Sequence, residues 1–107
     1  MATTTPNVSS AFQTFLDEAP AHAKAWMTAV EELGHASALD AKTSSLAYLA
    51  VLAAMRLESG IPLHVALAKR AGATRAEVLS AVLVGLPAAG NAVTQVLPVA
   101  LGAYDEA

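Results

Sequence analysis

The chain has no cysteine among its 107 residues, and charged and aromatic residues are scarce. The absence of cysteine excludes disulfide bonds, thiolate metal sites and thiol redox chemistry carried by the chain itself. Six basic and nine acidic residues give a net charge of −3, which offers no electrostatic footprint for a nucleic-acid backbone. Charged residues make up 14% of the chain, against about 25% in typical soluble domains. We therefore expect partner subunits or a membrane to cover part of its surface.

Apolar, helix-favouring residues dominate what is present. Hydrophobic residues make up 55% of the chain, the mean hydropathy is +0.49, and alanine supplies 26 residues. Alanine is the best helix former and is depleted in strands, so this composition predicts an all-α protein. A chain of this length forms one domain that buries only about 65% of its unfolded surface. The surplus apolar surface predicts a homo-oligomer with a largely apolar interface.

Residues 78–104 include no charged side chain, and the segment is long enough to span a bilayer. Pro87, Gly90 and Pro98 interrupt it, and no cluster of Lys or Arg flanks it. We therefore interpret the segment as a helix pair buried inside an oligomer and expect no membrane span. Residues 1–10 lack the pattern of a signal peptide, so we expect a flexible tail on a cytoplasmic protein, followed by a single domain over 11–107.

About six helices are expected from cap residues and apolar periodicity. The first covers 11–18 after a cap at Ser9 or Ser10, and the second begins at Pro20. The face of the second helix that is expected to be buried carries Ala23, Trp26, Val30 and Leu33. Asp40 is expected to cap a third helix from 41 to about 59, which ends where Gly60 takes a left-handed conformation.

The second half of the chain has equally clear boundary signals. Pro62 opens a fourth helix that reaches residue 71 and is closed by Gly72. Thr74 and Glu77 form a T-x-x-E capping box for a fifth helix, which is expected to reach 86. A sixth helical segment is expected over 88–104, where Pro98 either kinks the helix or starts its last portion.

The segment 56–64, RLESGIPLH, places several titratable groups at a helix end, a tight turn and the next helix start. His64 shares a helical face with apolar residues, so it is expected to be partly buried, with a pKa that depends on its neighbours. Such a pattern alone is more typical of a hydrogen-bonded core histidine than of a functional site. Arg56 and Glu58 can likewise form a solvated surface pair, so structural and functional interpretations both stay open.

Three stretches of this sequence resemble the carboxymuconolactone decarboxylase and alkylhydroperoxidase D-like family. They are residues 42–71, the sequence GATRAEV at 72–78 and the sequence GLPAAGN at 85–91, and the likeness covers roughly 39–106. The resemblance implies an all-α subunit whose central helical hairpin packs against copies of itself, as a trimer or hexamer. In the peroxidase branch it implies cysteines at Leu57 and Gly60 and a glutamate at Ser45, with the histidine at His64. Because the three other positions lack the required residues, peroxidase activity by this chain alone is excluded.

The decarboxylase branch of the family has no such cysteines and keeps a histidine at the position of His64. The resemblance therefore implies lyase-type acid/base chemistry on, or binding of, a small organic acid, with no cofactor and no metal ion. In this hypothesis His64 is the catalytic acid or base and Glu58 orients it or shares its charge. Arg56 binds a carboxylate, and Asn91 and Gln95 lend hydrogen bonds to the ligand. The alternative is a non-catalytic structural or ligand-binding relative that kept the oligomer after losing the redox cysteines.

Overall fold

The computed structural model describes residues 8–107, and within this range the chain is all-α with no strand. The α-helices are α1 (Ser10–Glu18), α2 (Pro20–Ala36), α3 (Ala41–Ala54), α4 (Ile61–Arg70), α5 (Arg75–Leu83), α6 (Leu86–Ala89) and α7 (Leu97–Glu106). Two 3₁₀ turns, η1 (Glu58–Gly60) and η2 (Asn91–Val96), connect them. Six of these α-helices are longer than one turn, which agrees with the predicted number of about six helices. Of the expected tail at residues 1–10, residues 1–7 lie outside the described range, and Ser10 belongs to α1 instead of the tail.

The predicted helix starts are confirmed by the cap hydrogen bonds. The Ser9 hydroxyl accepts from the Phe12 amide at 3.1 Å, and the Asp40 carboxylate accepts from the Thr43 amide at 2.8 Å. At α5 both halves of the capping box form, because the Glu77 amide donates to the Thr74 hydroxyl and the Thr74 amide donates to the Glu77 carboxylate. Each cap satisfies amides that a helix start leaves without a partner.

The predicted end of the third helix is wrong. Helix α3 stops at Ala54, and Arg56, not Gly60, takes the left-handed conformation, with φ of 58°. The Leu57 amide donates to the Leu52 carbonyl and the Arg56 amide to the Ala53 carbonyl, which is the hydrogen-bond pattern of a Schellman turn. Gly60 has φ of −85° and precedes the first residue of α4. The chain therefore reverses early, and α3 and α4 form a helical hairpin joined by η1.

Residues 78–104 do not form the simple helix pair that we expect from the sequence. Helix α5 ends at Leu83, Gly90 breaks the segment with φ of 82°, and Pro98 lies in the first turn of α7. Pro98 thus starts the last portion of the segment, which is one of the two expected outcomes. Its most buried residues lie in the core of the protomer itself and are fully inaccessible: Val78, Val82, Val93, Val96 and Ala100. None of the described helices is long and apolar enough to cross a membrane.

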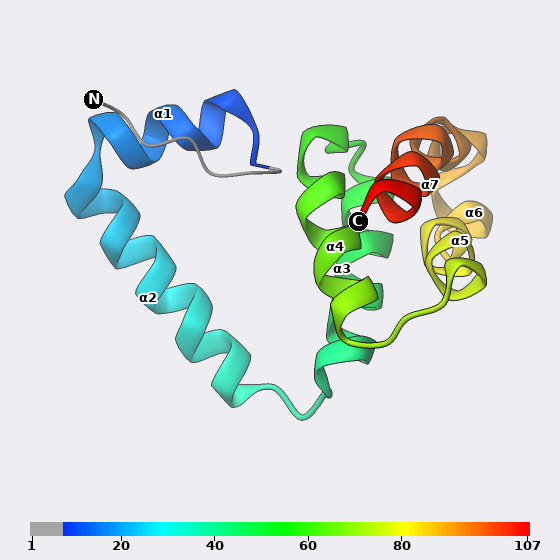
Figure 1. Ribbon diagram of the computed structural model, residues 1–107, viewed down its shortest axis with the longest axis horizontal. Coiled ribbons are helices and arrows are strands. Elements are labelled where there is room, and N and C mark those ends of the chain that lie inside the picture. The colour runs from blue at the N-terminus through cyan, green and yellow to red at the C-terminus, as the bar shows by residue number, and fades with distance from the viewer. Residues whose placement is uncertain (1–7) are drawn as a thin grey trace.

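The core lies between α3, α4, α5 and α7, while α1 and α2 form an arm that extends away from this body (Figure 1). The main contacts of α2 are with α1. The predicted buried face of α2 is wrong, because only Ala23 is buried, whereas Trp26 is 56% and Leu33 is 69% exposed. The periodicity correctly indicates an amphipathic helix, but residues 8–107 leave most of its apolar face uncovered.

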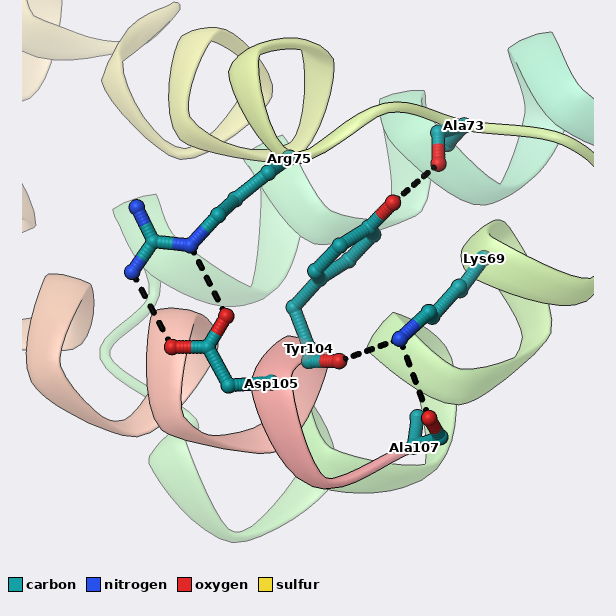
Figure 2. A network of polar contacts seen from close by, with 6 residues as sticks. All are labelled: Lys69, Ala73, Arg75, Tyr104, Asp105 and Ala107. Atoms are coloured by element: carbon teal, nitrogen blue, oxygen red, sulfur yellow. Dashed lines mark hydrogen bonds and ion pairs between the residues drawn. The ribbon is translucent and has the colours of Figure 1, made fainter.

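A polar network fastens α7 to the turn between α4 and α5 (Figure 2). The Tyr104 hydroxyl donates to the Ala73 carbonyl at 3.0 Å, and the Lys69 ammonium lies 4.4 Å from the centre of the Tyr104 ring. The same ammonium donates to the carbonyls of Tyr104 and Ala107 at the end of α7. Arg75 and Asp105 add a two-point ion pair with distances of 2.9 and 3.1 Å. The network therefore attaches the C-terminal helix α7 to α4 and to the start of α5.

Candidate functional site

His64 lies in the first turns of α4 and stacks on Tyr48 of α3. The ring centres are 4.2 Å apart and the planes are inclined by 26°. His64 is half-buried, and no described residue makes a hydrogen bond to its imidazole. Burial lowers the pKa of His64 from its ordinary value of 6.5, since no opposite charge compensates the lost hydration. The neutral imidazole is therefore favoured, and its nitrogens remain available to a ligand.

Glu58, the predicted partner of His64, lies in η1 and is exposed. Its carboxylate makes no hydrogen bond or ion pair with a described residue, so the structure does not join it to His64. Histidine bases that act in catalysis are commonly oriented by a hydrogen bond from a third group, and Glu58 does not provide one in this arrangement. The stacked Tyr48 ring is what holds the imidazole.

Arg56 and Gln95, both predicted as ligand-binding residues, are brought together by the fold. The Arg56 guanidinium donates to the Gln95 side-chain oxygen at 2.7 Å and connects the end of α3 to η2. Asn91 lies one turn before Gln95, and its backbone carbonyl accepts a 2.8 Å hydrogen bond from the Thr94 hydroxyl. A guanidinium has five N–H donors. This bond uses one donor and fixes the side chain, so further donors remain for an anion.

Both parts of the candidate site lie near one end of the α3–α4 hairpin. Arg56 follows α3 directly, and His64 comes four residues after Gly60, within the start of α4. The stacking of Tyr48 on His64 was not expected from the sequence. Its partner is 16 positions away on another helix, and no local pattern indicates that pairing.

Two surface grooves lie elsewhere on the molecule. One, of about 800 Å³, runs between α3 and α5 and includes the 2.8 Å ion pair of Lys42 and Glu77. A second, of about 550 Å³, lies between α4 and α7. Neither is lined by His64 or Arg56. Residues 8–107 contain no cluster of three or more His, Cys, Asp or Glu that could hold a metal ion.

The pKa of His64 predicts how the stability of the fold depends on pH. As pH falls from 7.5 to 5.5, the unfolded chain takes up the proton at a higher pH than the folded chain, so the free energy of unfolding decreases. Thermal unfolding should show a falling Tm over this range, and His64→Gln should remove that part of the decrease. Equal pH dependence in the two proteins would contradict it.

A separate decrease in the free energy of unfolding is expected at lower pH. The pKa of Asp40 is lowered by the hydrogen bonds from Thr43, that of Glu77 first by Lys42, and that of Asp105 first by Arg75. Their contribution is present above their ordinary values near 4 and is lost as pH falls through the lowered ones. The two pH ranges can therefore be distinguished in one series of unfolding curves.

The described fold defines a small all-α subunit with a central helical hairpin, an exposed apolar arm and a half-buried histidine on the hairpin. A family model matches residues 20–101, most of the chain, and its description is the carboxymuconolactone decarboxylase family. The chain belongs to this family, which confirms the resemblance seen in the sequence. The match begins at Pro20, so it includes α2 of the arm. No curated protein and no solved structure matches the chain significantly.

Proposed function

We propose that this member of the carboxymuconolactone decarboxylase family binds a small organic acid at the α3–α4 hairpin and carries out lyase-type acid/base chemistry on it. The observation that supports this proposal most directly is the His64–Tyr48 pair. A half-buried imidazole whose pKa is lowered is neutral near pH 7 and can accept a proton. With no hydrogen bond from a described residue, the ring is free to meet a ligand.

In this proposal Arg56 binds the carboxylate of the ligand. Its hydrogen bond to Gln95 limits the freedom of the guanidinium, and the remaining donors can form a charge-assisted pair with a carboxylate. Asn91, on the same 3₁₀ turn as Gln95, adds an amide to this region. Proton transfer between ligand and imidazole needs neither a cofactor nor a metal ion.

The second candidate function is non-catalytic binding. It is favoured by the position of Glu58, which makes no hydrogen bond to His64, so that no carboxylate orients the imidazole or stabilises its charged form. In that case the same residues bind the acid without converting it. A direct assay of ligand turnover distinguishes the two candidates.

We also propose that the protein works as a homo-oligomer, a trimer or hexamer. Large apolar side chains on α2 and α3 are exposed in the protomer, including Trp26, Leu33 and Met55. Contiguous apolar surface of this kind is typical of interfaces between subunits.

Isothermal titration with acetate, succinate and fumarate tests the proposed binding. We expect the native protein to bind at least one of these acids, and His64→Gln and Arg56→Gln to weaken binding at least tenfold. His64→Gln should cost less than about 1.5 kcal/mol of stability, because it removes a ring contact but leaves no buried partner unpaired. Arg75→Gln serves as the matched control, since Arg75 at the start of α5 pairs with Asp105 of α7 and contacts neither His64 nor Arg56.

Unchanged affinity in His64→Gln together with a lowered Tm would refute the role of His64 and leave it as a packing residue. Equal loss of affinity in Arg56→Gln and Arg75→Gln would show a general charge effect and would refute the role of Arg56.

A further inference from the structure

Two apolar surfaces of the protomer remain without partners. The first, which we term the arm stripe, lies on α2 and consists of Trp26, Met27, Val30 and Leu33. The second, which we term the hairpin patch, consists of Tyr48, Val51, Met55 and Leu67 on α3, its C-cap and α4. These eight side chains are between 37% and 69% exposed.

Both surfaces turn toward the same side of the molecule. A groove of about 580 Å³ where α2 meets the hairpin is lined by Gly34, Ser44 and Leu67, among others. On α2, Gly34 shares a helical face with Met27 and Val30. On α3, Ser44 shares a face with Tyr48 and Val51, at spacings of four and seven residues. The arm stripe and the hairpin patch therefore extend from the two walls of this groove.

The two surfaces do not cover each other within one chain. Helix α2 diverges from α3 and α4 beyond the groove, and its main contacts are with α1 (Figure 1). We propose that the arm stripe of one protomer packs on the hairpin patch of a second copy, reciprocally, and thereby covers the His64–Tyr48 pair. This inference rests on the proposed function and deepens it, because the candidate site is then complete only in the assembly. Of the two assemblies proposed above, only a hexamer, as three reciprocal pairs, can accommodate this exchange.

The available apolar area fits a second copy as the occupant. Eight large side chains that are each about half exposed present roughly 800 Å² per protomer, taking about 200 Å² for a fully exposed one. A stable specific interface buries about 800 Å² per partner. A reciprocal exchange uses both surfaces of both copies and so reaches this size.

Charge at the edges of the two surfaces is complementary. Glu31 and Glu32 lie beside the arm stripe, and Arg70 lies one turn beyond Leu67 at the edge of the hairpin patch. None of the three makes an ion pair with a described residue of its own chain. Opposite charges at the rim favour the correct register of two copies.

Packing of the partner arm also explains how His64, which is half-buried in the protomer, can be shielded from water when it acts as a base. In the protomer, Tyr48 covers one face of the imidazole and remains 50% exposed itself. Apolar side chains of the partner arm would exclude water from this pair, and electrostatic interactions with a bound acid strengthen when water is excluded.

Engineered cysteines provide the test, because the native chain has none to interfere. Val30→Cys and Val51→Cys proteins are mixed, allowed to exchange subunits and oxidised, and the products are separated without reductant. We expect the disulfide-linked heterodimer to dominate. Val84→Cys, which is 67% exposed at the end of α5, replaces Val51→Cys as the matched control and should link at least tenfold less. Equal linking by both partners would overturn the inference.

The double variant V30C/V51C distinguishes a second copy from closure of the arm onto its own body. Covalent dimers support the reciprocal exchange. An internal disulfide at the mass of a single chain would overturn it, because the arm would then cover its own hairpin.

A second measurement uses Trp26, the only tryptophan in the chain. Val51→Glu should at least halve the mass in light scattering, with the 10.9 kDa of one chain as the lower limit. It should also shift the Trp26 emission to longer wavelength, with unchanged helical circular dichroism. Val84→Glu should change neither quantity. An unchanged mass in Val51→Glu would overturn the inference.

Failure of this inference can be told apart from failure of the proposed function. The cross-linking and scattering experiments need no organic acid, whereas the titration needs no cysteine. Acid binding that depends on His64 but persists in a monomeric Val51→Glu protein would overturn the completion of the site by the partner and leave the binding function intact.

Discussion

Replacing Val93 by glutamate should unfold the protein rather than only separate the copies of the proposed oligomer. Val93 lies in η2, is fully inaccessible and belongs to the core formed by α3, α4, α5 and α7. A carboxylate at this position loses its hydration without gaining a partner, and the penalty for a buried ion is several kcal/mol. Domains of this size have a total stability of about 5–15 kcal/mol. Circular dichroism should therefore show loss of most helical signal at 25 °C, or a strongly lowered Tm.

Val84→Glu is the matched control for this prediction. The same substitution is made nine residues earlier, at a valine that is 67% exposed at the end of α5. Exposed substitutions change stability by about 0.5 kcal/mol or less, so the Tm should be nearly unchanged. A Val93→Glu protein that stays fully helical but loses its partners would contradict the prediction and place Val93 at an interface.

The boundaries that depend on neighbouring residues were predictable from the sequence. Caps at Ser9, Asp40 and Thr74 require only a side-chain oxygen two or three residues before a free amide. Gly72, with φ of 100°, closes α4 as expected, since a left-handed position is least costly for glycine. In each case the interaction is local and leaves a recognisable pattern in the sequence.

Features set by tertiary packing were not predictable in the same way. The left-handed position after α3 falls on Arg56, where the side chain gains a hydrogen bond to Gln95, 39 residues later. The hydrogen bond from the Leu57 amide to the Leu52 carbonyl then closes the end of the helix. Likewise, the periodicity of α2 shows an apolar face but not whether the same protomer covers it.

In the candidate site, too, some features follow from the local sequence and others depend on tertiary packing. The segment 56–64 lies at the turn of the α3–α4 hairpin, and Arg56 makes a hydrogen bond to Gln95. The contact that positions His64 comes from Tyr48, and no contact comes from the sequence neighbour Glu58. Proximity in the sequence predicted a carboxylate partner, whereas helix packing provides an aromatic one.

Replacing Tyr104 by alanine is expected to be the other strongly destabilising change. The side chain packs against the core, its hydroxyl donates to the Ala73 carbonyl, and its ring lies under the Lys69 ammonium (Figure 2). Loss of a large, partly buried aromatic together with these contacts should cost about 2–4 kcal/mol. That corresponds to a decrease in Tm of roughly 10–20 °C, measurable by thermal unfolding.

Two further variants separate the contributions within this network. Tyr104→Phe keeps the ring and removes the hydroxyl, and it should cost about 1–2 kcal/mol because the Ala73 carbonyl loses its donor. Arg75→Gln breaks only the exposed ion pair with Asp105 and should have little effect. The expected order of destabilisation is therefore Tyr104→Ala, then Tyr104→Phe, then Arg75→Gln. An Arg75→Gln protein less stable than Tyr104→Ala would contradict this order, because the surface ion pair and not the tyrosine would then hold α7 on the body.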